Sequence, residues 1–265
     1  MCAQSTLTTC TDAELNSADS NRVDPDDDAH NPTISIVVPV YNNAGSLPSL
    51  HKRLVSTLAS LDAAAEIIYV NDGSIDASYD VLIELFRDAK RVQVIDLARN
   101  YGQSSAILAA FSAAKGDVIV TIDADLENHP EDIPALVSAI RDGADLACGV
   151  RGRRRAPLFT RQGPSWLANR LVGRALNVRL DDWGCGLNAV KSDIAQQMLA
   201  QDPLPNLPKI EAALLSSRIA QVPVAYSDRE HGESQYTTWR LGGFAMAFLS
   251  DYSVTRTFRR LRSAS

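Results

Sequence analysis

Apolar and polar positions follow two alternating periodicities from Thr33 onward. Short β-branched runs typical of buried strands alternate with segments that carry apolar residues at helical spacing. Strands are predicted at 34–40, 66–70, 92–97, 116–122 and 145–150, and helices at 47–61, 77–89, 102–115 and 130–141. This succession predicts an α/β fold built on a doubly wound, mostly parallel sheet with right-handed crossovers.

Polar side chains stand where four of these strands end, at Tyr41, Asp72, Arg99 and Asp123. Parallel strands share one carboxyl edge, and open α/β sheets bind their ligands outside that edge. We therefore expect these four positions to meet in one site, although they are far apart in the sequence.

Asp123-Ala124-Asp125 is the strongest chemical signal, because two carboxylates flank one small residue directly after a buried strand. Taken alone, the pattern is more typical of a polar turn than of a metal site. Carboxylate oxygens suit Mg²⁺ or Mn²⁺, ions that usually complete their shells with phosphate oxygens and water. With the other strand ends beside it, the pair predicts a metal clamp on the diphosphate of a nucleotide-activated donor.

The pattern changes after Val150. A basic loop at 151–155 precedes a predicted helix at 160–176, and a Gly-rich acidic turn follows at 181–186. A further strand is predicted at 219–226, followed by a polar loop at 227–237. The helix would place three polar residues on one face, at i, i+4 and i+8: Arg161, Ser165 and Asn169.

Charge is distributed unevenly along the 265 residues. Seven acidic residues and one arginine within residues 1–30 account for the whole net charge of −6, so the rest of the chain is neutral. Residues 1–31 therefore read as a disordered acidic tail. A neutral body without aromatic residues among the arginines of 151–155 argues against nucleic-acid binding.

Location and redox state follow from what the sequence lacks. The chain has no secretory signal and no apolar run of roughly 20 residues, which predicts a cytoplasmic protein that does not span a membrane. The four cysteines show no paired spacing and are expected to be reduced thiols. Residues 239–265 combine five arginines with aromatic and leucine residues. This basic amphipathic tail predicts either a helix at a membrane surface or a helix that caps the domain.

Six separated motifs together resemble one group of enzymes. The motifs are Val38-Pro-Val-Tyr-Asn42, Asn71-Asp-Gly-Ser74, Arg99-Asn-Tyr-Gly-Gln103, Asp123-Ala-Asp-Leu126, Asp182-Trp-Gly-Cys185 and Arg229-Glu-His-Gly-Glu-Ser234. They are similar to the inverting GT-A glycosyltransferases of the dolichol-phosphate mannosyltransferase type, and most of all to undecaprenyl-phosphate aminoarabinose transferases. The resemblance implies a GT-A catalytic domain at 32–238, with a donor half at 32–150 and an acceptor half at 151–238.

The resemblance also implies roles for individual residues. Asp72 would accept a hydrogen bond from a uracil N–H, and Arg229 would close over the donor phosphates. Asp123 and Asp125 would hold Mg²⁺ or Mn²⁺. The other residues expected in the donor site are Pro39, Tyr41, Asn43, Arg99, Gly102, Ala124 and Ser234. Those expected on the acceptor side are Arg161, Ser165, Asn169, Trp183, Asn188 and Gln235.

Two departures from these relatives concern the acceptor. Asn188 stands where they carry an arginine, and Gln235 stands where they carry a lysine. Losing two cations weakens the expectation of a polyprenyl-phosphate acceptor, because an anion is bound through such groups. A hydroxyl acceptor, unlike a phosphate, needs a base to take its proton. Asp182 is the first candidate for that base and Asp181 the second.

The sequence therefore predicts a metal-dependent inverting glycosyltransferase that uses a UDP-sugar, such as UDP-GlcNAc or UDP-glucose. The expected activity is that of a hexosyl- or N-acetylhexosaminyltransferase. The expected acceptor is a soluble small molecule or a carrier-bound intermediate, as in secondary-metabolite biosynthesis. Two alternatives stay open: a polyprenyl-phosphate glycosyltransferase in peripheral contact with a membrane, and a catalytically silent nucleotide-sugar-binding module. The oligomeric state is not predicted.

Overall fold

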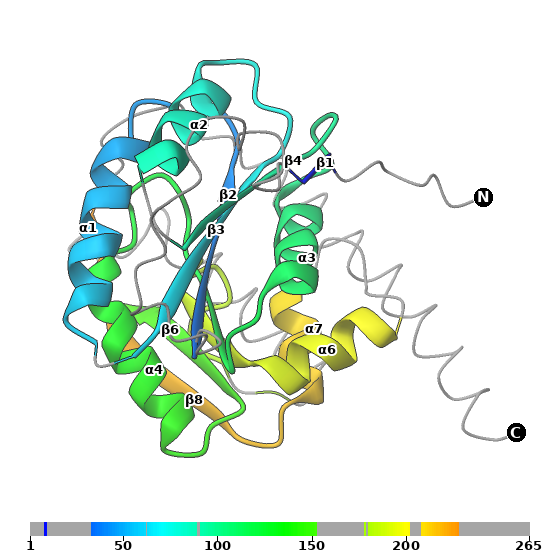
Figure 1. The fold of residues 1–265 in the computed structure, drawn as a ribbon. Helices are drawn as coiled ribbons and strands as arrows, with labels where there is room; N and C mark the ends of the chain where they lie inside the picture. The colour runs from blue at the N-terminus through cyan, green and yellow to red at the C-terminus, as the bar shows by residue number, and fades with distance from the viewer. Residues whose placement is uncertain are drawn as a thin grey trace, which may run out of the picture. The chain divides into compact units, whose positions relative to one another are not determined.

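The computed structural model describes residues 8–9, 33–61, 63–88, 91–152, 178, 180–201 and 208–227. All of them belong to one compact unit, Met1–His231 (Figure 1). Its strands are β1 Thr8–Thr9, β2 Ile34–Val40, β3 Ala65–Asn71, β4 Val92–Asp96, β5 Val118–Thr121, β6 Leu146–Arg151, β7 Asn188–Lys191 and β8 Ile219–Val224. Its helices are α1 Leu47–Ala59, α2 Ser78–Asp88, α3 Gln103–Ala113, η1 Pro130–Asp132, α4 Ile133–Arg141, α6 Ser192–Ala200 and α7 Pro208–Leu215.

The strands form one sheet in the order β1-β4-β3-β2-β5-β7-β6-β8. β2 lies between β3 and β5 and runs parallel to both, and β4 is parallel to β3. β8 is parallel to β6, whereas β7 is antiparallel to its neighbours β5 and β6. The prediction of a mostly parallel α/β sheet is confirmed.

Four elements were not predicted from the sequence: β1, β7, α6 and α7. β7 is only four residues long, and its Asn-Ala-Val-Lys sequence contains no apolar run that would identify a strand. Its pairing with β5 through Thr121–Asn188 and Val118–Lys191 places it in the sheet. Tertiary pairing therefore decides this strand, as often happens for short segments of weak propensity.

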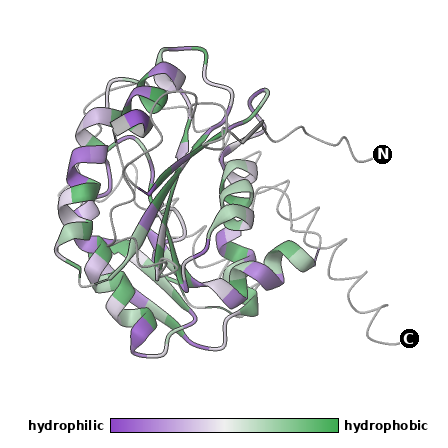
Figure 2. Ribbon diagram, in the orientation of Figure 1, coloured by the Kyte–Doolittle hydropathy of each residue, from purple (hydrophilic) through white to green (hydrophobic). Residues whose placement is uncertain are grey.

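Helices cover the sheet on both faces, and alternate residues of each strand enter different cores. Even-numbered residues of β2, such as Ile36 and Val38, pack with α1, α2 and α4, and Val37 packs with α3, α6 and α7. Figure 2 shows green apolar positions on the sheet and mixed green and purple positions along α1 and α4. Two buried faces explain why the strands read as continuous apolar runs.

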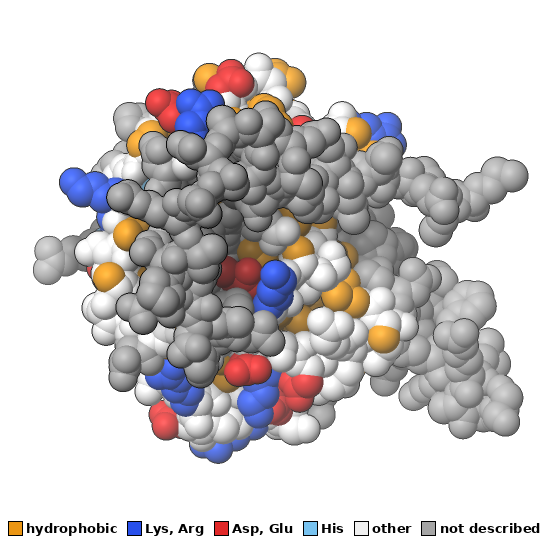
Figure 3. Space-filling view, viewed as in Figure 1, with side chains coloured by type: hydrophobic (Ala, Val, Ile, Leu, Met, Phe, Trp, Pro, Cys, Tyr) orange, Lys and Arg blue, Asp and Glu red, His pale blue; other side chains and the backbone are white. Residues whose placement is uncertain are grey.

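Helix α3 is rich in apolar residues, and its exposed positions include Gln103, Ser105 and Ser112. Ala106, Ala110 and Phe111 are buried against the sheet, and Ile107 and Leu108 are only partly buried. Figure 3 shows hydrophobic side chains gathered on the surface over this helix. No helix among the described residues combines the length and the apolar character needed to cross a membrane.

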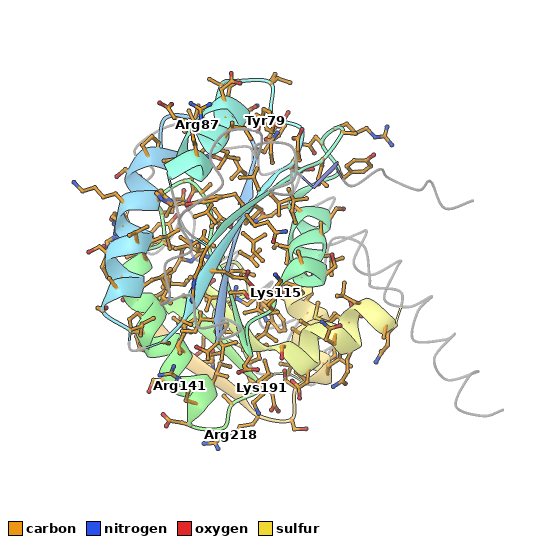
Figure 4. The ribbon with its side chains drawn as sticks, viewed as in Figure 1. Tyr79, Arg87, Lys115, Arg141, Lys191 and Arg218 are labelled. Carbon is orange, nitrogen blue, oxygen red and sulfur yellow. The ribbon has the colours of Figure 1, made fainter. Side chains whose placement is uncertain are left out.

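The amino edge of the sheet is fastened by Asp145. Its carboxylate pairs with Lys191 at 2.9 Å and accepts the backbone N–H groups of Ser217 and Arg218, each at 2.9 Å. Figure 4 labels Lys191 and Arg218 at this lower end of the sheet. These contacts join the ends of β6, β7 and β8 at the amino edge. The candidate site lies at the opposite, carboxyl edge of the sheet.

Two regions expected to be tails have different outcomes. Thr8 and Thr9, within the predicted acidic tail, pair antiparallel with Asp96 and Ile95 of β4. Residues 239–265, the predicted basic amphipathic tail, lie outside the described residues.

Candidate active site

The carboxyl edge of the sheet brings the predicted donor residues together. Asp72 directly follows β3, and Asp123 lies two residues beyond the end of β5. These two strands flank the central strand β2. Pro39 is buried within β2, and Tyr41 is partly exposed just beyond its end. Strand ends that are distant in the sequence therefore line one edge, as parallel topology requires.

Asp72 fixes the loop that leads into α3. Its two carboxylate oxygens accept the backbone N–H groups of Tyr101 at 2.7 Å and Gly102 at 2.9 Å. The side chain is 2% exposed, and burial raises the pKa of this carboxyl against the opposing effect of the two backbone hydrogen bonds. Each carboxylate oxygen can accept more than one hydrogen bond, so these two contacts leave room for the predicted hydrogen bond from a nucleotide base. That contact stays a prediction.

Gly73 is required by the same loop. Its φ is +62°, and a Cβ at this position would lie 2.4 Å from the carbonyl carbon of Arg99. Only glycine allows the chain after β3 to pass so close to the backbone of the Arg99 loop. Arg99 is exposed, with its guanidinium carbon 5.0 Å from the centre of the Tyr101 ring.

The loop after β2 is held by hydroxyl groups from the next crossover. Asn42 donates its N–H to Ser74 Oγ at 3.1 Å, and Asn43 donates its N–H to Ser78 Oγ at 2.8 Å. Asn42 adopts a φ of +55°, a conformation that asparagine tolerates better than most residues. The predicted donor residue Asn43 is thus held in the turn that precedes α1.

Asp123 and Asp125 are held from several sides. Gln103 Nε2, from the first turn of α3, donates to Asp123 Oδ1 at 2.6 Å. Ser46 Oγ donates to the carbonyl of Ala124 at 2.6 Å. Asp125 is 7% exposed and accepts the N–H of Glu127 at 3.1 Å. Gly186 lies so close that a Cβ there would stand 1.9 Å from Asp123 Oδ2.

The negative charge at this point is concentrated. Burial, together with the charges of Asp125 and Glu127, raises the pKa of Asp123 to about 6. The hydrogen bond from Gln103 and the charge of Arg151 act in the opposite direction. A pKa raised by neighbouring carboxylates indicates a site that is short of positive charge.

This donor set fits Mg²⁺ or Mn²⁺. Asp123 and Asp125 offer hard oxygen atoms, and a divalent cation would relieve the repulsion that raises the pKa of Asp123. Among the described residues, no three His, Cys, Asp or Glu side chains are arranged to hold a metal ion by themselves. Two protein carboxylates suit an ion that keeps water and phosphate oxygens in its shell.

The pKa of Asp123 makes a prediction for the metal-free protein. Folding favours the protonated carboxyl, because its pKa rises from 3.8 to about 6. The associated stability is complete below pH 3.8 and is lost as the pH rises through 6. Relative to wild type, Asp123→Asn should therefore gain up to about 2 kcal/mol in free energy of unfolding between pH 4 and 7. Urea unfolding in EDTA measures this, and a difference that is constant with pH would contradict it.

Asp182, the first candidate for a catalytic base, forms an ion pair. Arg151 Nε and Nη2 donate to its two carboxylate oxygens at 2.7 and 2.8 Å, and the Arg151 backbone N–H adds a contact at 3.2 Å. Burial tends to raise the pKa of Asp182, but the hydrogen bonds and charge of Arg151 outweigh it, and the pKa is lowered. Both oxygens of this carboxylate are thus occupied by a guanidinium.

The turn that carries Asp182 is fastened by a lysine. Lys209 Nζ, from α7, donates to the carbonyl oxygens of Asp182 at 2.8 Å and Cys185 at 3.2 Å. Asn188 Nδ2 donates to the same Cys185 carbonyl at 3.0 Å. Asn188 Oδ1 and Trp183 Nε1 are buried and have no hydrogen-bond partner among the described residues. The predicted acceptor side therefore contains unused polar atoms.

Of the remaining predicted residues, the structure describes Asp181 but not six others. Asp181 donates its backbone N–H to Gln221 Oε1 at 2.7 Å, which ties the turn to β8. Six predicted site residues lie outside the described residues: Arg161, Ser165, Asn169, Arg229, Ser234 and Gln235. Their roles stay predictions.

Several residues of the site were not predicted from the sequence as such. Gln103 stands at the end of the quoted Arg99 motif, so its place beside Asp123 had a signal in the sequence. Lys209 lies far from every motif and Tyr226 lies three residues before the Arg229 motif but outside it. Only their contacts with Asp182, Arg151 and Glu127 reveal them. No sequence pattern foretells such contacts, because they depend on how distant elements pack.

A family comparison agrees with this geometry. Residues 35–191, more than half of the chain, match the model of the family described as glycosyl transferase family 2. The chain belongs to this family. The matched range begins in β2 and ends with β7, so it covers Asp72, Asp123, Asp125 and Asp182.

Individual relatives share about two fifths of their residues with the chain. An undecaprenyl-phosphate 4-deoxy-4-formamido-L-arabinose transferase of Pseudomonas fluorescens is 43% identical over 210 residues, which are 78% of this chain and 61% of that protein. The enzyme of the same name from Edwardsiella ictaluri is 40% identical over 78% of this chain and 64% of its own length. The chain thus spans less than two thirds of these relatives.

Solved structures share the fold. Glucosyl-3-phosphoglycerate synthase of Mycobacterium tuberculosis, solved with Mn²⁺, UDP and glucosyl-3-phosphoglycerate, superposes with a TM-score of 0.60 over 83% of this chain and 78% of that one. The same enzyme with Mn²⁺, UDP and phosphoglyceric acid gives 0.61 over 83% and 77%. Both are 20% identical to this chain, so the likeness establishes a GT-A-like fold and nothing finer.

Two expectations from the sequence differ from the names of these relatives. The chain is a glycosyltransferase, but the named relatives transfer a formamido-arabinose, a pentose, so the expectation of a hexosyl enzyme is not supported by them. The acceptor named for these relatives is undecaprenyl phosphate, not a soluble compound.

Proposed function

We propose that this glycosyltransferase moves a sugar from a UDP-sugar to a polyprenyl phosphate at a membrane surface, with Mg²⁺ or Mn²⁺ between Asp123 and Asp125. The observation that carries the choice of acceptor is the ion pair between Asp182 and Arg151, with oxygen–nitrogen distances of 2.7 and 2.8 Å. The names of the relatives point to the same class of acceptor.

The ion pair bears on the mechanism because it removes the best candidate for a base. A carboxylate with both oxygens on one guanidinium and a lowered pKa accepts a proton poorly. A phosphate acceptor is already ionised near neutral pH and attacks the anomeric carbon without giving up a proton. Asp182 would then act by holding Arg151 and the 182–185 turn in place.

The donor half offers groups for the nucleotide and its diphosphate. Asp72 lies beside the Tyr101–Gly102 loop and has acceptor capacity left for a base N–H. When bound, the divalent cation would offset the charge that develops on the departing diphosphate. Arg229 and Ser234, outside the described residues, are proposed to approach the same phosphates. A single displacement with inversion requires the acceptor phosphate to approach the anomeric carbon from the face opposite the departing diphosphate.

The identity of the sugar is proposed from the relatives. A UDP-linked 4-formamido pentose is the first donor to test, because the curated relatives are named for that sugar. UDP-glucose and UDP-GlcNAc, the donors expected from the sequence, are the second and third. Epimer choice depends on the shape of the pocket, which the acidic motif does not fix.

A transfer assay tests the acceptor directly. The full chain is incubated with each labelled UDP-sugar, Mn²⁺ and undecaprenyl phosphate in detergent, and glycolipid is separated from free sugar. We expect label in the lipid fraction and none when undecaprenol replaces the phosphate, because the alcohol lacks the ionised nucleophile.

Other outcomes identify the alternatives. Transfer to undecaprenol or to a soluble hydroxyl compound, without transfer to the phosphate, would refute the proposed acceptor and require another base. Binding of UDP in calorimetry without transfer to any acceptor would favour the catalytically silent module.

A further inference from the structure

The segment after β8 is fastened to the segment after the paired aspartates at three backbone positions. Tyr226 pairs with Asn128 in an isolated antiparallel bridge, and Ser227 donates its N–H to the Glu127 carbonyl at 3.0 Å. Ala225 donates its N–H to Asp132 Oδ2 at 2.7 Å. The backbone on both sides of Tyr226 is therefore fixed relative to the chain that follows Asp125.

A side-chain contact strengthens this connection. His129 Nε2 and Ser227 Oγ form a hydrogen bond of 2.6 Å. Ser227 is also the first residue of the predicted polar loop of 227–237, whose other residues lie outside the described ones. The 225–227 segment thus links the acidic motif to the start of that loop.

Tyr226 itself touches groups from both halves of the site. Its hydroxyl donates to the Glu127 carboxylate, two residues beyond Asp125. The guanidinium carbon of Arg151 lies 5.2 Å from the centre of its ring, within cation–π range. Arg151 in turn pairs with Asp182. One side chain therefore joins an anion beside the donor carboxylates to the ion pair on the acceptor side.

Neither the hydroxyl bond to Glu127 nor the cation–π contact with Arg151 would by itself fix these two side chains relative to each other. Arg151 is at the end of β6 and Glu127 is in the loop after β5, and the two strands are separated in the sheet by β7. The hydrogen bond fixes one end of the phenol ring and the guanidinium covers its face. A rigid aromatic ring with a polar tip suits this bridging position, because it orders few rotatable bonds.

We propose that Tyr226 is a positioning residue that sets the Glu127 carboxylate and the Arg151–Asp182 ion pair relative to each other, and thereby shapes the diphosphate end of the donor site. This inference rests on the proposed use of a UDP-sugar. It assigns Tyr226 no contact with substrate, and Tyr226 lies two residues beyond β8 and outside every motif found in the sequence.

Two substitutions separate the contacts of Tyr226. Tyr226→Phe removes the hydroxyl bond to Glu127 and keeps the ring beneath Arg151, whereas Tyr226→Leu removes both. Affinity for UDP in the presence of Mn²⁺ is measured by calorimetry, and kcat and KM are measured with the donor found active. We expect Tyr226→Phe to weaken UDP binding about tenfold, on the scale of losing a supporting contact around a metal site. Tyr226→Leu should weaken it similarly and also lower kcat about tenfold.

Tyr69→Phe is the matched control for losing a buried tyrosine hydroxyl. Tyr69 is fully buried and its hydroxyl hydrogen-bonds His51 Nδ1 at 3.0 Å, in the core between β3 and α1. This variant should have a lower unfolding temperature with UDP affinity and kcat unchanged. A purely structural role for Tyr226 would give its variants the same pattern.

A double-mutant cycle identifies the partner of the hydroxyl. In a Glu127→Ala background, Tyr226→Phe should weaken UDP binding no further, because the bond is already absent. Additive losses in the cycle, or UDP affinity and kcat within twofold of wild type in folded Tyr226→Phe and Tyr226→Leu, would overturn the inference. Wild-type protein that fails to bind UDP with Mn²⁺ would instead refute the proposed function, and this inference would fall with it.

Discussion

Asp125→Ala should lower turnover at least about 100-fold, the scale of removing a main electrostatic stabiliser of a leaving group. Asp125 is 7% exposed, and its charge, like that of Glu127, raises the pKa of the neighbouring Asp123. Loss of one carboxylate would weaken the hold on the divalent cation and leave the diphosphate charge less well compensated. Initial rates at saturating donor measure the effect.

Two comparisons make this result interpretable. Asp80→Ala removes an exposed acid from the first turn of α2 and should leave turnover within twofold of wild type. Asp125→Asn keeps the size of the side chain and should resemble Asp125→Ala if charge is what matters. Near-normal turnover in both Asp125 variants would show that the cation is held elsewhere in the chain.

Gly186→Ala should also lower turnover about 100-fold, although the change adds only a methyl group. That methyl would lie 1.9 Å from Asp123 Oδ2 and 2.4 Å from its carboxyl carbon, so Asp123 must rotate away. The side chain that moves is one proposed to bind the metal, and a displacement of about 1 Å in a catalytic group costs on the order of 100-fold in rate. Stability should change much less than rate, because the obstruction is a side-chain end rather than backbone.

Gly152→Ala is the matched control for this substitution. A Cβ at Gly152 meets nothing within 4 Å, so the same chemical change should leave both rate and unfolding temperature near wild type. Calorimetric affinity for Mn²⁺ with UDP provides a second measurement. A Gly186→Ala enzyme with wild-type affinity and rate would mean that Asp123 tolerates displacement and does not hold the metal.

Gly186 illustrates which parts of the site a sequence reveals. The turn from 181 to 186 is recognisable as a glycine-rich acidic turn, but nothing in it indicates that Gly186 faces Asp123. That contact arises because β7 pairs antiparallel with β5, which brings the turn against the end of the Asp123 strand. β7 was not predicted, since its four residues lack an apolar pattern, and its consequence for Gly186 could not be predicted either.

Asp182 shows a similar division. Its motif marked it as important and suggested a base, because a carboxylate beside a glycine can approach a substrate. Its partner Arg151 lies 31 positions earlier, at the end of β6, and was grouped with the basic loop that follows. Only the fold shows the two as an ion pair, and the proposal of a phosphate rather than a hydroxyl acceptor rests on that contact.

The sequence by itself determined the α/β class, the parallel strands at 34–40, 66–70, 92–97 and 116–122, the family motifs and the acidic pair Asp123 and Asp125. These properties are local, since apolar periodicity and strand-end residues are written in consecutive positions and parallel topology then gathers them at one edge. The tertiary structure alone decided the partners of those residues, namely Gln103 and Gly186 beside Asp123, Arg151 on Asp182, and Tyr226 between Glu127 and Arg151. Such contacts join residues from different elements, and their formation depends on strand order and register, which no single segment of the chain encodes.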